Sequence, residues 1–109
     1  MNACPQLFED ILVFRQQCRA TAEAVGLLDR GIVAPGYKAD LNVIDFEHLG
    51  MGAPRLVWDL PAGGKRLLQR SYGYLHTFVS GVEICRDGES TGATPGHLVR
   101  GAQAAPAVA

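Results

Sequence analysis

This sequence of 109 residues has almost no excess of either charge, few aromatic side chains and no long hydrophobic run. Its formal net charge is −1 and its pI is near 6.3, so it lacks the positive potential that attracts nucleic acid or an anionic membrane surface. Its apolar stretches fall well short of the roughly 20 residues that cross a bilayer. We therefore expect neither nucleic acid nor a membrane among its partners.

Cysteine is also scarce. Cys4, Cys18 and Cys85 are odd in number and far apart, which favours free thiols over a disulfide framework. The first ten residues, MNACPQLFED, lack the charged and apolar regions of a signal peptide. Together these observations predict a cytoplasmic protein.

No motif typical of a metal centre is present in the sequence. His48, His76 and His97 are separated by 28 and 21 residues, whereas zinc sites usually contain a close pair of ligands. Isolated surface or half-buried histidines are therefore favoured over a metal site built from this chain. Cys85 lies in an apolar run, which favours a small buried hydrophobic residue over a nucleophile.

Other catalytic patterns are incomplete. In a phosphate-loop alignment of Gly-Gly-Lys-Arg (residues 63–66), Asp59 replaces the first glycine and Arg66 replaces the magnesium-binding hydroxyl, so a loop at one end of a β domain is favoured. Asp40 and Asp45 flank one apolar run at a spacing that favours turn caps or solvent-facing carboxylates over an acid/base pair. No serine has a G-x-S-x-G context. We therefore predict no catalytic, cofactor-binding or metal-binding residue.

The sequence does contain patterned apolar side chains, and its 48% hydrophobic and 19% charged content is typical of one globular domain. Residues 7–25 carry apolar side chains at spacings of 4, 3, 4, 4 and 3, which predicts a helix with one apolar face. These positions are Leu7, Ile11, Phe14, Cys18, Ala22 and Val25.

Strand-forming runs separated by turns follow the predicted helix. Gly26 suits the left-handed residue that closes a helix, and Pro35 with Gly36 fits the centre of a type II turn. Gly81 lies between two β-branched apolar runs and predicts a hairpin. The candidate strands are residues 41–46, 55–58, 66–70, 74–80 and 82–86. We therefore expect a helix and its turn over 1–30, a small β domain over 31–101 and a flexible tail over 102–109.

Residues 26–46 resemble the metal-dependent amidohydrolase superfamily at the point where the chain leaves the catalytic barrel. The family pattern is G-x-(I/L)-x-x-G-x-x-A-D-L-x-V-(I/L)-D, which runs here from Gly31 to Asp45 with Val33 at the Ile/Leu position. Across residues 19–103 the chain is most similar to the N-acyl-D-amino-acid deacylase (D-aminoacylase) branch. The segments that recur in that order are GLLDRG (26–31), DLPAGG (59–64) with RLLQR (66–70), and LVRG (98–101).

This resemblance implies a non-catalytic piece of a hydrolase that cleaves C–N amide bonds of N-acyl amino acids. In such enzymes zinc is held by barrel residues, including a His-x-His pair, and none of that barrel is encoded here. The implied fold is mainly β with an N-terminal α-helix, as part of the composite β-sandwich or barrel-like domain of amidohydrolases, without the catalytic (β/α) barrel. We expect no cofactor in this chain.

Half of a composite domain leaves sheet edges and apolar faces uncovered, which favours pairing with another chain. We therefore expect self-association, most simply as a homodimer, through the helix at 7–25 and the open sheet edges. The alternative is a stand-alone homo-oligomeric binding or interaction module of unknown ligand. An autonomous enzyme is the least favoured interpretation, because no cluster of ionisable residues occurs at a useful spacing.

Overall fold

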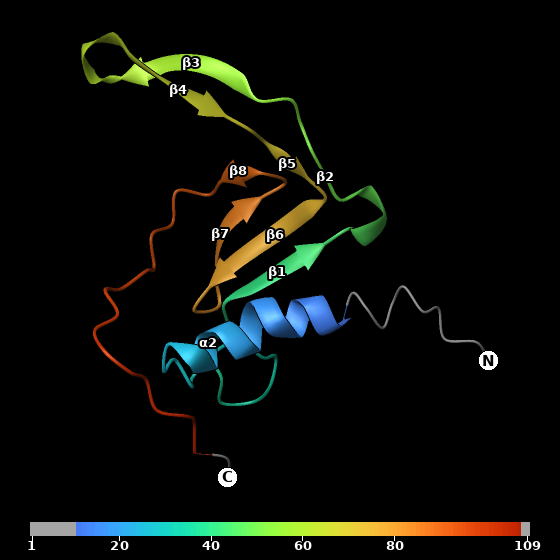
Figure 1. The fold of residues 1–109 in the computed structure, drawn as a ribbon, viewed down its shortest axis with the longest axis vertical. Helices are drawn as coiled ribbons and strands as arrows, with labels where there is room; N and C mark the ends of the chain where they lie inside the picture. Colours follow the sequence, from blue (N-terminus) through green and yellow to red (C-terminus); the bar gives the residue numbers. More distant parts are fainter. Residues whose placement is uncertain (1–10, 108–109) are drawn as a thin grey trace, which may run out of the picture. The chain divides into compact units, whose positions relative to one another are not determined.

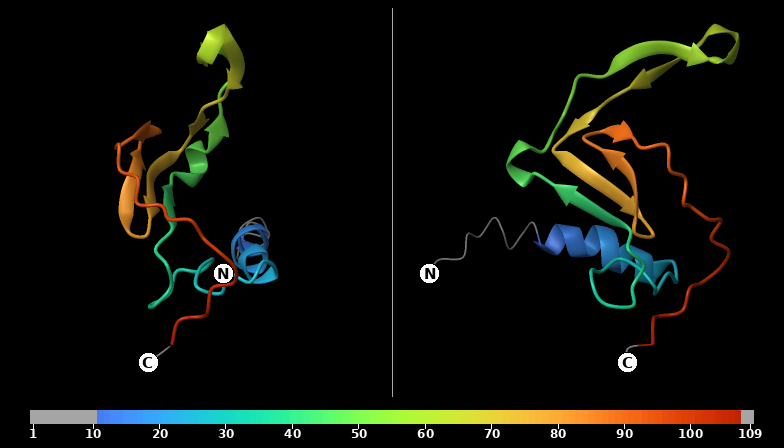
Figure 2. Two further views of the ribbon diagram at one scale, coloured as in Figure 1. Left: turned by 90° about the vertical axis from the view of Figure 1, so that its left-hand side faces the viewer. Right: turned by 180° about the vertical axis from the view of Figure 1, so that it is seen from behind.

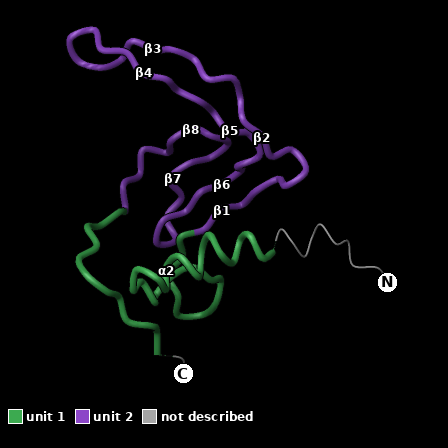
Figure 3. Tube along the Cα trace, viewed as in Figure 1, with its two compact units in different colours: residues 1–40, 96–109 green, residues 41–95 purple. Residues whose placement is uncertain are grey.

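The computed structural model describes residues 11–107. The chain divides into two compact units (Figure 3). One unit comprises the chain up to Asp40 together with the segment from Gly96 onward, and the other is Leu41–Pro95. Within the described residues, one helix near the N-terminus is followed by short strands in open sheets (Figure 1). The predicted mainly β fold with an N-terminal helix is therefore confirmed.

Residues 11–24 form the helix, which ends in α2 (Thr21–Ala24). Its end is a Schellman motif, because the Leu27 amide donates to the Ala22 carbonyl at 2.8 Å and the Gly26 amide donates to the Glu23 carbonyl at 3.1 Å. Gly26 has a φ of 75°, as its predicted place at the helix end requires.

The middle of the helix differs from the prediction, because Gln16–Ala20 (η1) winds as a π-helix. The Thr21 hydroxyl donates to the Gln16 carbonyl five residues earlier, at 2.8 Å. A wider turn accommodates about one extra residue and so rotates the following positions by about 100°. The predicted apolar stripe therefore does not continue along one face.

The stripe is also largely uncovered. Ile11, Phe14 and Val25 are 56%, 47% and 63% exposed, whereas Ala22 is buried. Leu7, the first position of the predicted stripe, lies outside the described residues. The helix thus exposes large apolar side chains among the described residues.

The second unit is built on one long antiparallel hairpin with two interruptions (Figures 1 and 2). Its outgoing strands are β1 (Leu41–Ile44), β2 (Gly50–Met51) and β3 (Arg55–Leu60). After the turn η3 (Pro61–Gly63), its returning strands are β4 (Gly64–Leu68), β5 (Ser71–Tyr72) and β6 (Tyr74–Val79). The pairs are β1 with β6, β2 with β5, and β3 with β4, so the last two pairs remain two-stranded.

Two tight hairpins extend the β1–β6 pair into a sheet of order β1-β6-β7-β8, with β7 (Val82–Arg86) and β8 (Glu89–Ser90). Ser80 and Gly81 join β6 to β7 with φ values of 51° and 78°. Asp87 and Gly88 join β7 to β8 with φ values of 49° and 79°. Positive φ at both central residues is the signature of a type I′ turn. The predicted hairpin at Gly81 is confirmed.

The strand bounds differ in detail from those predicted. The first strand ends at Ile44 rather than residue 46, because the 3₁₀ turn η2 (Phe46–His48) starts there. The turn at Pro35 and Gly36 is confirmed: the Tyr37 amide donates to the Ala34 carbonyl at 3.2 Å, and Gly36 has a φ of 86°. The two-residue strands β2, β5 and β8 were not predicted.

The described residues bury very little. Ala22, at 8% exposure, is the one buried apolar side chain among residues 11–107. Val33, Met51, Trp58, Leu67 and Leu98 are all more than 60% exposed. Apolar surface that would form the core of a self-sufficient domain therefore faces outward.

The C-terminal segment pairs with the turn that follows the helix. The Leu28 amide donates to the Gln103 carbonyl at 3.0 Å, and the Gln103 amide donates to the Gly26 carbonyl at 2.9 Å. The division predicted at residues 30 and 101, and the flexible tail, stay predictions. Among the helical residues described, none form a helix long and apolar enough to cross a membrane.

Candidate functional site

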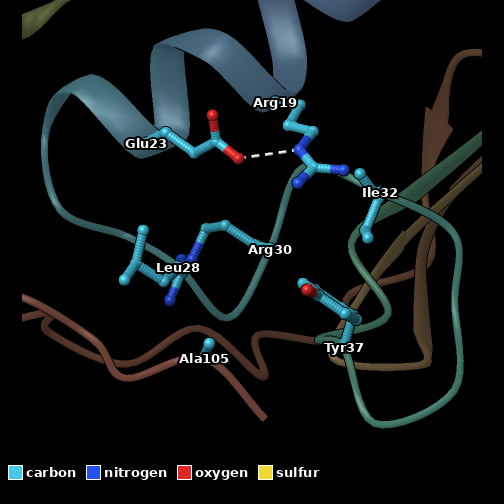
Figure 4. A pocket seen from close by; sticks show the side chains of 7 residues that line it. All are labelled: Arg19, Glu23, Leu28, Arg30, Ile32, Tyr37 and Ala105. Atoms are coloured by element: carbon cyan, nitrogen blue, oxygen red, sulfur yellow. Dashed lines mark hydrogen bonds and ion pairs between the residues drawn. The ribbon is translucent and has the colours of Figure 1, made fainter. Parts of the chain in front are cut away.

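The first unit contains a small cavity of about 130 Å³ beneath the helix end (Figure 4). Side chains from the helix, from the two turns after it and from the C-terminal segment line it. They are Arg19, Glu23, Leu28, Arg30, Ile32, Tyr37 and Ala105.

A close approach of backbone to backbone positions these side chains. Gly31 has a φ of 89°, and a Cβ built on it would lie 2.9 Å from the Arg19 Cα and 3.0 Å from the Cys18 carbonyl oxygen. Only glycine permits both the φ value and the contact. Gly31 thus lets the loop press onto the π-helical turn, which brings Arg30 and Ile32 to the cavity beside Arg19.

The charges around the cavity are paired. Arg30 binds Asp29 through two hydrogen bonds of 2.8 and 3.0 Å, and Arg19 Nε lies 2.7 Å from Glu23 Oε1. The hydrogen bonds from Arg30 lower the pKa of Asp29, and the same bonds raise the pKa of Arg30. Asp40 lies 3.4 Å from Lys38 Nζ.

This arrangement joins the helix and the loops and offers little chemistry. Three cationic and three anionic side chains compensate one another, so the cavity has no strong field for a charged ligand. Its lining contains no histidine, cysteine or serine to act as a base or nucleophile. At this volume it holds a few water molecules or one very small polar molecule, since ligand pockets usually measure about 300 Å³ or more.

A second polar cluster lies on the four-stranded sheet. His76 Nδ1 lies 2.5 Å from Glu83 Oε1, and Arg86 Nε donates to the same oxygen at 3.2 Å. The hydrogen bond from Arg86 is the largest cause, and that from His76 the next largest, of a pKa of Glu83 that is lowered to about 2. Glu83 is therefore an ionised carboxylate that holds both neighbouring side chains in place.

This cluster lacks a nucleophile. His76 pairs with Arg86, and Thr77 pairs with Cys85, in consecutive positions of the β6–β7 ladder. Consecutive residues of a strand point to opposite faces, so Cys85 faces away from His76. Cys85 is half-buried rather than fully buried, and Cys18 is exposed.

The three histidines have different local surroundings. His48 Nδ1 lies 2.8 Å from Asp45 Oδ2 at a largely exposed position, and His97 is exposed on the C-terminal segment. Within residues 11–107, no three side chains of histidine, cysteine, aspartate or glutamate are grouped to hold a metal ion. Cys4 lies outside the described residues.

The remaining candidate residues from the sequence lie in turns and at strand ends. Asp40 and Asp45 lie at opposite ends of β1, each beside a basic side chain. The Gly-Gly-Lys-Arg segment forms the end of a hairpin turn and the start of β4, and Arg66 Nε donates to Asp59 Oδ1 at 2.8 Å. Sequence reasoning missed this pair and the Arg19–Glu23 pair, although spacing of four residues on a helix is a recognised signal for the latter.

Comparisons with known proteins give short matches to one kind of enzyme. The chain is 51% identical over 37 residues to adenine deaminase 1 of Agrobacterium fabrum, which covers 34% of this chain and 6% of that protein. It is equally identical over 37 residues to adenine deaminase of Brucella anthropi, covering 34% of this chain and 7% of that protein. With adenine deaminase 1 of Rhizobium meliloti it shares 36% identity over 63 residues, covering 53% of this chain and 11% of that protein.

The chain therefore spans about a tenth or less of the length of these curated relatives. No family model matches the sequence. No solved structure matches it. Adenine deaminase is a member of the amidohydrolase superfamily, so the similarity supports a relationship at the level of that superfamily and does not single out the deacylase branch.

Proposed function

We propose that this chain is a non-catalytic β module of an amidohydrolase-type, metal-dependent hydrolase. Its role is structural: it completes the small β domain beside a catalytic barrel that lies outside these 109 residues. The partial similarity to adenine deaminases and the short, open sheets of the second unit both support this role.

The observation that carries the proposal is the lack of burial among the described residues. A domain of this size that folds alone removes more than half of its chain's surface from water. Here Ala22 is the one buried apolar side chain among residues 11–107, while Trp58, Met51 and Val33 are largely exposed to solvent. Such a surface needs a covering partner, and the rest of a longer hydrolase supplies one.

We propose the reaction of the larger hydrolase first as a general class and then as a specific substrate. Hydrolysis of a C–N bond is common to both enzymes that the sequence resembles. The DLPAGG segment at 59–64 and the LVRG segment at 98–101 support the finer assignment to N-acyl-D-amino-acid deacylases. The matches to adenine deaminases support deamination of adenine instead, over 37 to 63 residues.

Zinc does not fit the described residues. His48 and His76 are each held by a carboxylate on a different element, and His97 lies on the C-terminal segment. The described side chains therefore provide no ligand set, and no step of the reaction is assigned to them.

The test combines activity with association. The purified chain, supplied with zinc, is assayed for ammonia release from adenine and for acetate release from N-acetyl-D-amino acids, and we expect neither. It is then co-expressed with the product of the neighbouring reading frame, which we expect to encode a His-x-His barrel and to co-elute with the chain. Turnover by the chain alone, or a neighbouring barrel that elutes without it, would contradict the proposal.

A second candidate function is a stand-alone homo-oligomeric interaction module. The exposure of Ile11 and Phe14 on the helix favours it, together with the open edges of β1 and β8. In this case two copies cover each other, with the helix and the sheet edges in the contact.

A further inference from the structure

Residues 102–106, which we call the strap, lie along the turns that follow the helix in the first unit. At the middle of the strap, the Gln103 amide donates to the Gly26 carbonyl at 2.9 Å, and the Gln103 carbonyl accepts from the Leu28 amide at 3.0 Å. Ala105 lines the cavity beneath the helix end from this segment (Figure 4). The strap therefore forms one wall of the cavity.

Two glycines on the turns receive the ends of the strap. A Cβ built on Gly26 would lie 3.2 Å from the Ala102 Cβ, and a Cβ built on Gly36 would lie 3.1 Å from the Pro106 Cβ. Both distances are tighter than nine in ten Cβ contacts in proteins, so the absence of these two side chains makes room for the strap. Contacts at both ends, with the backbone bonds at Gln103 between them, fix the register of the strap.

The attachment is specific but slight. The strap has alanine at 102, 104 and 105, so these positions offer no large apolar side chain to bury. The Gln103 side chain donates to the Gly101 and Ala102 carbonyls, beside itself, at 3.3 and 3.2 Å, and thus adds no bond to the turns. A segment with few buried apolar contacts and few backbone hydrogen bonds opens locally at a low free energy.

The chain before the strap allows it to move by itself. The structure describes all of residues 91–101, and it places no helix or strand there. Gly101, directly before the strap, has a φ of 71°, and no described atom lies within 4 Å of its Cβ position. Glycine in such open space changes its backbone angles without a steric penalty, so Gly101 is suited to be a hinge.

We propose that the strap is a lid on the cavity beneath the helix end. It opens as one unit about Gly101 while the helix and the turns stay folded, and it closes onto Gly26 and Gly36. The closed strap shields the lining, in which Ile32 and Tyr37 are half-buried. The open strap admits water or a very small polar molecule to the cavity of about 130 Å³.

This inference goes beyond the proposed function, because it concerns the first unit by itself and needs no catalytic barrel. Its tests measure amide exchange and side-chain exposure in the full chain. Their failure would leave the activity and co-elution tests of the proposed function untouched.

Hydrogen exchange of single amides, followed by NMR on the full chain, tests the opening. The Leu28 and Gln103 amides form the two bonds that must break, whereas the Leu27 amide donates to the Ala22 carbonyl at the helix end. We expect the first two amides to share one protection factor, at least about tenfold below that of Leu27. Unequal protection of the two, or protection equal to that of Leu27, would contradict opening as one unit. A protection factor of about 1 at Gln103 would contradict a closed strap.

A pair of proline variants tests the bond at the middle of the strap. Gln103→Pro removes the amide that donates to the Gly26 carbonyl. We expect the protection of the Leu28 amide to fall about fivefold or more, as for the loss of one hydrogen bond, with Leu27 unchanged. Ala104→Pro is the matched control, because the Ala104 amide donates to no described residue. Equal protection of Leu28 in the two variants would overturn the proposal.

The methyl groups of Ile32 show whether the strap covers the cavity. A soluble gadolinium chelate relaxes the NMR signals of groups that solvent reaches. We expect its effect on Ile32 to rise in Gln103→Pro and to stay at the wild-type value in Ala104→Pro. Relaxation of Ile32 that is unchanged in Gln103→Pro would overturn the role of the strap as a lid. If Gln103→Pro fails to fold by circular dichroism, the exchange rates of the wild-type chain decide.

Discussion

Two single residues determine how the two polar clusters are arranged, one through its backbone conformation and the other through its charge. Gly31 admits the close approach of the loop to the π-helical turn, and Glu83 gathers His76 and Arg86 on the sheet. We expect changes at these residues to alter the stability of the chain, because each of them holds neighbouring groups in place.

Replacing Gly31 by alanine should destabilise the first unit by about 1–3 kcal/mol. The alanine would be forced into the left-handed backbone conformation, and its Cβ would lie only 2.9 Å from the Arg19 Cα. The change is measured as the shift in the urea unfolding midpoint by far-ultraviolet circular dichroism. Gly96→Ala is the control, because Gly96 has no positive φ and no neighbour within 4 Å of its Cβ position. Equal stability of the two variants would remove the argument for a required glycine.

Glu83 should make the stability of the sheet depend on acidity. Its pKa is lowered from 4.5 to about 2 in the folded chain, so the unfolded chain binds the proton first. The stabilisation is therefore complete above pH 4.5 and is lost as the pH falls toward 2. The urea midpoint measured across this range should fall less steeply in Glu83→Gln than in the wild type. Parallel curves for the two proteins would show that Glu83 is not the group responsible.

The turn residues were predictable because each rests on a local rule. Gly26, Gly36 and Gly81 all take the positive φ expected from their sequence context. The Asp87–Gly88 turn follows the same rule and was a missed signal, since Asp-Gly between strands favours a type I′ hairpin. The partners of Glu83 were not predictable, because they depend on the register between β6 and β7.

At the scale of elements, the spacing of apolar residues predicts the helix and the main strands, but it does not predict their irregularities. The spacing of apolar residues assumes 3.6 residues per turn, so it carries no signal for the π-helical turn at Gln16–Ala20. The pairing of β3 with β4 and of β2 with β5 depends on the long hairpin as a whole. Two-residue strands are too short for any pattern to identify.

The helix provides the prediction that belongs to this scale. If its apolar side chains form a contact between copies, Ile11→Asp with Phe14→Asp should lower the mass seen by light scattering to that of a monomer. Each large apolar side chain left in water forfeits about 1.5–3 kcal/mol, so their burial would stabilise a dimer. Arg15→Asp, on an exposed polar position of the same helix, is the control. A wild-type chain that is monomeric at micromolar concentration contradicts this contact.

At the scale of the whole molecule, the described residues form two compact units with little buried apolar surface. The sequence indicated this outcome only through its resemblance to one part of a larger enzyme, because composition alone predicted an ordinary globular domain. The composition was typical of a globular domain because the apolar side chains are present. Among the described residues, these side chains lack a surface on which to pack.

The most direct test of this account is the binding of a fluorescent apolar dye, 8-anilinonaphthalene-1-sulfonate, to the isolated chain and to the chain with its covering partner. We expect strong dye fluorescence from the chain at low concentration, with near-native circular dichroism, and a marked loss of that fluorescence when the barrel polypeptide or a second copy covers it. An isolated monomer that binds no dye and unfolds in one cooperative transition would contradict the claim that this chain needs a partner surface.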